Sequence, residues 1–168
     1  MGSALAHAVL ADNIPLASFL LADAGVDPNE PRMYGGRPPI VSTAHLGMFE
    51  MMDLLMKHGA QVKGTNALFN VMTSDRMDVL SYLVNRKGVD VNTIQPVEES
   101  GELIPGPVLH LAVQMRNSKW VRLLLKKFGA NPLVKDQSGK TAVDWARCIG
   151  DPAIHKQLDL TYSKCQII

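Results

Sequence analysis

The sequence predicts an all-α repeat protein of about five helix-turn-helix units joined by hairpin-like loops. Three observations lead to this fold class. Amphipathic helical patterns that close in a glycine recur along the chain, a shorter helical pattern precedes each of them, and the apolar positions of these shorter patterns match. Because neither helix of such a pair can bury its apolar face alone, the pairs must stack and share one continuous core.

The longer patterns are the second helices of the units. Four of them read "ASFLLADAGVDPN", "MMDLLMKHGAQV", "LSYLVNRKGVDVN" and "VRLLLKKFGANP". Each contains a closing glycine, the residue that most readily takes the left-handed conformation just past a helix end. These glycines are spaced by 34, 29 and 41 residues, at Gly25, Gly59, Gly88 and Gly129.

The shorter patterns are the first helices of the units. They read "SALAHAVLADN", "PPIVSTAHLGM", "NALFNVMTSDR", "PVLHLAVQMRN" and "KTAVDWARCIGD". Small residues in them let neighbouring helices approach closely. Their matching apolar positions are Leu5, Ile40, Leu68, Leu109 and Val143. We expect one domain over residues 1–168, with repeats at about 3–31, 32–61, 62–92, 93–133 and 134–160 and a tail at 161–168.

Two segments carry a resemblance to a known family. "PVLHLAV" (Pro107–Val113) keeps the Leu-His centre of a T-P-L-H-x-A signature, and "DQSGKTAVDWAR" (Asp136–Arg147) is similar to a typical last repeat. The chain resembles the ankyrin-repeat family from about Ser3 to Leu160. The resemblance implies an ankyrin-repeat solenoid, and it implies a structural role for His110, whose ring would hydrogen-bond backbone in the turn.

The two ends of the predicted stack differ in polarity. The last helix, "DPAIHKQLDL", offers polar residues to solvent, with Asp151 as its cap and Pro152 in its first turn. The first helix, "SALAHAVLA", is more apolar all round. We interpret it as an imperfect cap with exposed alanines and expect a monomer. The alternative is a self-association surface that gives a weak homodimer through the N-terminal helix.

The segment "TIQPVEESGELIPGP" has no helical or strand period and is long for a connection inside a compact domain. Matching repeat units lie on both sides of it, so it is not a linker between domains. We interpret residues 93–107 as an enlarged hairpin tip that projects beside the ligand-binding surface. The alternative is a tolerated surface insertion, because longer loops add only slowly to closure entropy.

Composition and cysteine content narrow the class of protein. A formal net charge of +1 gives no reason to expect nucleic acid as a partner, and no apolar run approaches the ~20 residues of a membrane span. The N-terminus is not a convincing signal peptide, and Cys148 and Cys165 form no disulfide framework. We therefore expect a cytoplasmic or nuclear protein with an unmodified C-terminal tail.

The sequence contains no arrangement that predicts catalysis. No two histidines lie at an i, i+4 spacing on one helix, so we expect no metal site and no cofactor. His45 has no neighbouring carboxylate in the sequence to orient it, and Cys148 is expected to be a buried thiol. A basic set is interpreted as the solvated face of second helices: Arg76, Arg86, Lys87, Lys119, Arg122, Lys126 and Lys127.

The resemblance also implies where a partner would bind. Ankyrin proteins usually hold partners on a concave surface made of hairpin tips and the exposed ends of first helices. Leu10, Leu46, Met115 and Ile149 are apolar at those ends, which favours an amphipathic helix or an extended peptide, unless they turn inward to the core. The predicted partner-binding residues are Tyr34, Arg37, His45, Leu46, Thr73, Ser74, Glu98, Leu103, Gln114, Met115, Lys140 and Ile149.

Two functions remain open from the sequence. The preferred one is a non-catalytic module that binds a protein or peptide through this concave groove and the 93–107 insertion. The alternative is a small-molecule binding protein or unusual enzyme, with the insertion as a lid over an apolar pocket lined by Tyr34, His45, Leu46 and Met115.

Overall fold

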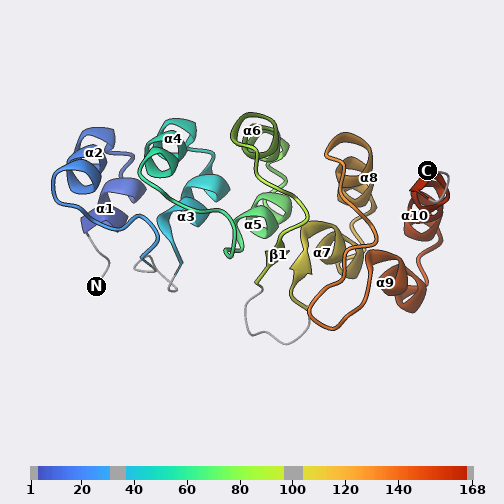
Figure 1. The fold of residues 1–168 in the computed structure, drawn as a ribbon. Helices are drawn as coiled ribbons and strands as arrows, with labels where there is room; N and C mark the ends of the chain where they lie inside the picture. Colours follow the sequence, from blue (N-terminus) through green and yellow to red (C-terminus); the bar gives the residue numbers. More distant parts are fainter. Residues whose placement is uncertain (1–3, 31–36, 97–103, 166–168) are drawn as a thin grey trace. The chain divides into compact units, whose positions relative to one another are not determined.

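The computed structural model describes residues 4–30, 37–96 and 104–165, with side chains up to Asp159 (Figure 1). These residues form ten helices and one two-stranded sheet. The helices come in five pairs, which confirms the predicted all-α repeat. The chain divides into two compact units, Met1–Leu83 (unit 1) and Val84–Ile168 (unit 2). That the repeats form a single domain stays a prediction.

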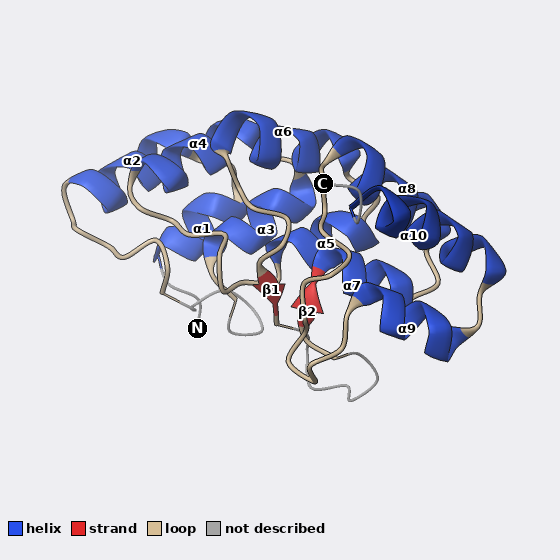
Figure 2. Ribbon diagram, turned by 45° about the vertical axis from the view of Figure 1, so that its right-hand side comes forward, coloured by secondary structure: helices blue, strands red, loops and turns tan. Residues whose placement is uncertain are grey.

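Unit 1 holds two layers of helices. Its first helices are α1 (Ala4–Leu10), α3 (Pro39–Leu46) and α5 (Ala67–Thr73). Its second helices are α2 (Ile14–Ala22), α4 (Phe49–Lys57) and α6 (Met77–Lys87), and α6 continues into unit 2. α1 packs on α3 and α3 on α5 in one layer, while α2 packs on α4 in the other (Figure 2).

The core of unit 1 lies between these layers and follows the predicted apolar positions. Leu5, Ile40 and Leu68 are at most 1% exposed. Ala8 and Ala44, one helical turn or so later, are equally buried and let the first helices approach closely. Burying a Leu or Ile side chain contributes about 1.5–3 kcal/mol, so these repeated positions stabilise the stack at each step.

Unit 2 repeats this arrangement and adds a small sheet. Its elements after α6 are β1 (Ile94–Gln95), β2 (Gly106–Pro107), α7 (Val108–Gln114), α8 (Ser118–Lys127), α9 (Ala142–Ile149) and α10 (Pro152–Cys165). α7 packs on α9 and α8 on α10. Leu109 and Val143 are buried as predicted, and Trp120 on α8 is buried as well.

The loops that follow the second helices are held by asparagine side chains. In unit 1, Asn29 accepts a hydrogen bond from the Gln61 N–H at 2.8 Å and donates one to the Gly59 carbonyl at 3.0 Å. In unit 2, Asn92 accepts from the Asn131 N–H, also at 2.8 Å. Each of these bonds joins the loop of one repeat to the loop of the next, so the spacing between loops is fixed by side-chain amides.

The described ends of the 93–107 segment form the stem of a hairpin. β1 and β2 pair antiparallel, with Ile94 opposite Pro107 and Gln95 opposite Gly106. Gly106 suits this place because a Cβ there would lie 3.0 Å from the Asp136 Cβ and 3.3 Å from the His110 Cβ. The segment is thus anchored as an enlarged hairpin tip at both described ends.

Candidate functional site

The exposed ends of the five first helices are built in the same way. Each helix is followed by one residue with a positive φ, which turns the chain into the second helix. These turn residues are Asp12, Gly47, Asp75, Arg116 and Gly150. The repeat register assigns residues just before these turns to a binding surface: Leu10, His45 and Leu46, Thr73 and Ser74, Gln114 and Met115, Cys148 and Ile149.

In unit 1 two of these ends open onto a hollow of about 240 Å³. Leu10 is 46% exposed and Leu46 is 47% exposed, so neither turns inward to the core. Two exposed leucines beside a hollow form an apolar surface that is unfavourable to leave in contact with water. The lining residues come from α1, α3, α5 and the preceding hairpin tip: Leu10, Arg37, Val41, Ser42, His45, Leu46 and Asn70.

Sequence reasoning missed Asn70 as a lining residue of this hollow. Asn70 precedes Ser74 by four residues, so both lie on one face of α5, and that spacing is the signal that could have found it. The Ser74 hydroxyl donates to the Asn70 carbonyl, and the Thr73 hydroxyl donates to the same carbonyl at 3.1 Å. The two hydroxyls therefore bond to the end of their own helix.

His45 is oriented by a hydroxyl from the next repeat, which sequence reasoning did not anticipate. The His45 Nδ1 lies 2.9 Å from the Ser74 Oγ. Which of these two atoms donates depends on the imidazole tautomer, and the Ser74 hydroxyl also bonds to the Asn70 carbonyl.

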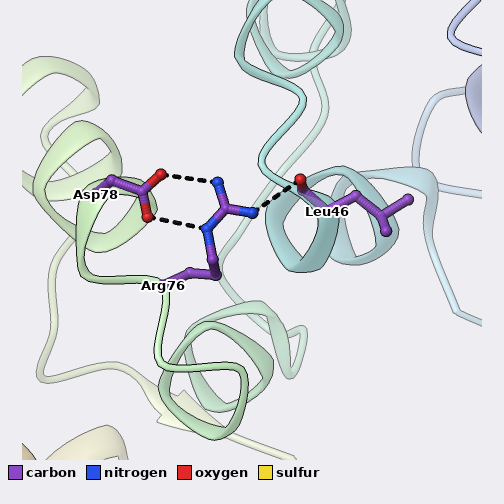
Figure 3. Close-up of polar contacts among 3 residues, drawn as sticks. All are labelled: Leu46, Arg76 and Asp78. Carbon is purple, nitrogen blue, oxygen red and sulfur yellow. Dashed lines mark hydrogen bonds and ion pairs between the residues drawn. The ribbon is translucent and has the colours of Figure 1, made fainter.

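Arg76 ties the end of α3 to the start of α6 (Figure 3). Its Nη1 donates to the Leu46 carbonyl at 2.9 Å, while Nε and Nη2 donate to the two Asp78 carboxylate oxygens at 2.9 and 2.7 Å. The guanidinium lies against Gly47, where a Cβ would come within 1.8 Å of Nη2. Arg76 was expected on a solvated face; it instead caps the last carbonyl of α3.

The same contact shifts both ionisable groups. The hydrogen bonds from Arg76 lower the pKa of the Asp78 carboxyl, and the hydrogen bonds to Asp78 raise the pKa of the Arg76 guanidinium. The Asp78 side chain is 52% exposed, so solvent screens the pair. The interaction mainly fixes the position of Leu46 beside the hollow.

In unit 2 the equivalent helix end is hydrogen-bonded to another segment of the same chain. The Gln114 side-chain amide accepts from the Ile104 N–H at 2.8 Å and donates to the Ile104 carbonyl at 3.2 Å. The Gln137 N–H donates to the Pro105 carbonyl at 3.3 Å. Gln114, predicted to contact a partner, therefore holds the described downstream end of the 93–107 segment.

His110 is buried with the turn around it. Neither ring nitrogen makes a hydrogen bond of ordinary geometry to the described residues, although the resemblance implies bonds to backbone. Burial lowers the pKa of His110, while the Asp136 carboxylate and the backbone of Val134 and Lys140 oppose that shift. The imidazole is therefore favoured in its neutral form. Solvent does not reach the ring, so its position is structural.

The hairpin tip before α9 is organised by a buried carboxylate. Asp136 accepts from the Trp145 Nε1–H at 2.6 Å and from the Ser138 hydroxyl at 2.8 Å. Burial raises the pKa of Asp136, but these hydrogen bonds outweigh it and the pKa is lowered. The Lys140 ammonium lies 4.4 Å from the centre of the Trp145 ring. Lys140, a predicted partner-binding residue, thus has an aromatic contact within its own repeat.

The remaining predicted residues divide into three groups. Met115 is 42% exposed, and Ile149 is half-buried. Cys148 is exposed, which corrects the expectation of a buried thiol; it lies near the end of α9, where a neighbouring repeat would be needed to cover it. Tyr34, Glu98 and Leu103 lie outside the described residues.

The described ranges contain neither a metal site nor a membrane span. No three His, Cys, Asp or Glu side chains within residues 4–30, 37–96 and 104–159 gather closely enough to hold a metal ion. No helix in the described part of the chain is long and apolar enough to cross a membrane.

Comparison with known proteins identifies the repeat. The family model described as ankyrin repeat matches residues 108–137, from the start of α7 into the next hairpin tip. A crystal structure of an ankyrin repeat domain from Acinetobacter baumannii AYE matches with a TM-score of 0.62 and 26% sequence identity, covering 94% of this chain and 80% of that chain. No curated protein matches the sequence significantly.

Proposed function

Because this chain is an ankyrin-repeat protein, we propose that it is a non-catalytic module that binds one partner protein or peptide through the exposed ends of its first helices. Ankyrin repeats generally serve in protein–protein interaction. The observation that supports this surface is the pair of exposed leucines, Leu10 and Leu46, beside the hollow of unit 1.

The hollow suits an apolar side chain of a partner rather than a reaction. Leu10 and Leu46 supply apolar contact area, and Asn70 and Ser42 supply hydrogen-bonding groups at the edge of the hollow. Arg76 and Gly47 fix the end of α3, so Leu46 is held in place before a partner arrives. Pre-ordering of this kind lowers the entropy cost of binding.

Unit 2 contributes to the proposal through Met115 and the 93–107 segment. Met115 is exposed directly after Gln114, the residue that holds Ile104. A partner that contacts Met115 would therefore meet the described end of the insertion as well. Methionine adapts to the shape of a bound surface, which suits an amphipathic helix or an extended peptide.

The location of this binding is also a proposal. We place it in the cytoplasm or nucleus, because the two cysteines form no disulfide framework of the secreted kind. The alternative function, a small-molecule site beneath the insertion, depends on a cavity under residues 93–107, and residues 97–103 lie outside the described part of the chain. No observation on the described residues favours that alternative.

The test is affinity capture from the native source, followed by calorimetry on the captured partner. Leu46→Glu combined with Met115→Glu should weaken binding at least tenfold, because a buried charge replaces an apolar contact in each unit. Leu133→Glu is the matched control: Leu133 is 40% exposed and lies on the loop between α8 and α9, outside the first helices. Binding that survives the double substitution would sink the assignment of this surface.

A further inference from the structure

The second helix of the first repeat exposes apolar side chains that have no counterpart in the other repeats. Leu16 on α2 is 41% exposed, and Phe19 is 55% exposed. Leu16, Phe19 and the half-buried Leu20 lie at i, i+3 and i+4, so they share one face, named here the α2 outer face. α2 contains no charged residue.

Equivalent positions in the other second helices show how this face is normally buried. Leu16 and Leu20 are the third and seventh residues of α2. In the other second helices both positions are buried, with exposed fractions of at most 1%: Met51 and Leu55, Val79 and Leu83, Trp120 and Leu124, Ile154 and Leu158. The position that holds Leu16 is therefore a core position of the repeat, and in the first repeat it is left open.

The sixth residue of the second helix shows which neighbour normally covers this face. Tyr82, the sixth residue of α6, packs edge-on against the Phe49 ring of α4 with 5.0 Å between ring centres. Its hydroxyl also donates to the Asp53 carboxylate of α4. The face thus contacts the second helix of the preceding repeat. Phe19 is the sixth residue of α2, and Figure 1 shows α3 and α4 on one side of the α1–α2 pair within unit 1.

The first helix of the same repeat, α1, buries its central alanines. Ala6 and Ala8 are buried, so the exposed alanines of the expected helix "SALAHAVLA" are the two at its ends, Ala4 and Ala11. The unpartnered apolar surface is therefore on α2 rather than on the N-terminal helix.

The last repeat is built in the opposite way. The fourth and eighth residues of the second helix are Ala17 and Leu21 in the first repeat, but His155 and Asp159 in the last. His155 and Asp159 pair at 2.8 Å. Together with Arg147 and Lys156 they line an open hollow of about 540 Å³. This face of the last repeat is polar, whereas the α2 outer face is not.

From this asymmetry we infer that the α2 outer face binds the α2 outer face of a second copy of this chain across a twofold axis. Head-to-tail stacking would press Leu16 and Phe19 against Arg147, Lys156 and Asp159, which would lose hydration without apolar contact in return. An uncharged face can meet its own copy, and a twofold contact closes at two chains. The inference concerns a surface separate from the first-helix ends.

Analytical ultracentrifugation of the full chain tests this from about 1 μM to about 1 mM, a range that covers tight to weak complexes. We expect a reversible equilibrium that stops at the dimer. Leu16→Glu with Phe19→Glu should weaken dimerisation at least about thirtyfold, the effect of one interface hot spot. Leu46→Glu, an equally exposed leucine in the same unit, should leave it unchanged, which separates this surface from the partner-binding one.

Both substituted side chains are exposed, so the fold should survive, and circular dichroism melting of the variant checks that it does. A second variant, Phe19→Ser, removes the ring without adding charge and should also weaken the dimer. A chain that stays monomeric over the whole range would overturn the inference. So would a dimer unaffected by either variant, growth beyond two chains, or an α2 face that retains only some other protein.

Discussion

The equivalent ends of two first helices, α3 in unit 1 and α7 in unit 2, make different contacts. In unit 1, α3 ends at His45 and Leu46 beside an open hollow. Arg76 of the following repeat donates a hydrogen bond to the Leu46 carbonyl. In unit 2, Gln114 and Met115 end α7, and the Gln114 amide is taken by Ile104 of the same chain. The comparison teaches that repeat register fixes where a side chain stands but not what it binds.

A second contrast concerns burial at one position. Trp120 in unit 2 and Leu16 in unit 1 are both the third residue of a second helix, yet Trp120 is 1% exposed and Leu16 is 41% exposed. The largest expected effect follows from this difference. Trp120→Ala should lower the free energy of unfolding by about 3–5 kcal/mol, because it leaves a cavity.

Leu16→Ala is the matched control for this substitution. It should change the free energy of unfolding of the monomer by less than about 1 kcal/mol, because the side chain is already in water. Urea denaturation at low protein concentration measures both. Hydrogen exchange should place the loss for Trp120→Ala in unit 2. Equal costs for the two substitutions would contradict the burial that separates them.

The next effect concerns the turn after α3 and its counterpart after α9. Gly47 and Gly150 have nearly the same positive φ, 73° and 68°. A Cβ on Gly150 meets nothing within 4 Å, whereas a Cβ on Gly47 meets the Arg76 guanidinium. Gly150→Ala should cost about 1–2 kcal/mol for the left-handed backbone alone. Gly47→Ala should cost about 1 kcal/mol more, because the Arg76 hydrogen bonds must break.

A double substitution isolates that contact. In an Arg76→Ala background, Gly47→Ala should cost no more than Gly150→Ala, because no guanidinium lies over the glycine. Thermal denaturation of the four proteins gives the coupling. A Gly47→Ala cost that does not change in that background would mean that Arg76 does not pack on the turn.

Much of this fold could be predicted because its signals are local. The closing glycines Gly25 and Gly59 both have positive φ, and the apolar positions Leu5 and Ile40 are both buried. Helix ends and buried faces depend on neighbours within one or two turns, which a sequence shows directly. The same register placed Leu46 at a helix end but left open whether it faces solvent or the core, and the structure shows it 47% exposed.

The contacts that shape the candidate site could not be predicted. Arg76 bonds to a carbonyl 30 residues earlier, and Gln114 bonds to a backbone unit 10 residues earlier. No periodicity links such pairs, because their meeting depends on how repeats of different length stack. The exposure of Leu16 was missed for a related reason: an apolar residue at a core position shows no sign in the sequence of whether a neighbouring helix covers it.

A smaller effect tests how firmly unit 2 holds its own segment. Gln114→Ala removes both hydrogen bonds to Ile104, and exchange of the Ile104 amide proton should quicken roughly tenfold, which corresponds to about 1.4 kcal/mol of local stability. His45→Ala, at the same place in unit 1, should leave that amide unchanged. Nuclear magnetic resonance measures the exchange. An Ile104 amide that exchanges equally fast in the wild type would contradict the contact.

The smallest effect is a pH dependence that belongs to unit 2. Burial lowers the pKa of His110, so the folded chain keeps the ring neutral while the unfolded chain binds a proton near its ordinary pKa of about 6.5. This contribution to stability is fully present above that pH and falls as the pH drops below it. Urea midpoints at pH 8 and pH 5.5 should differ less for His110→Leu than for the wild type. A His110→Leu protein that keeps the wild-type difference would show that another group carries the pH dependence.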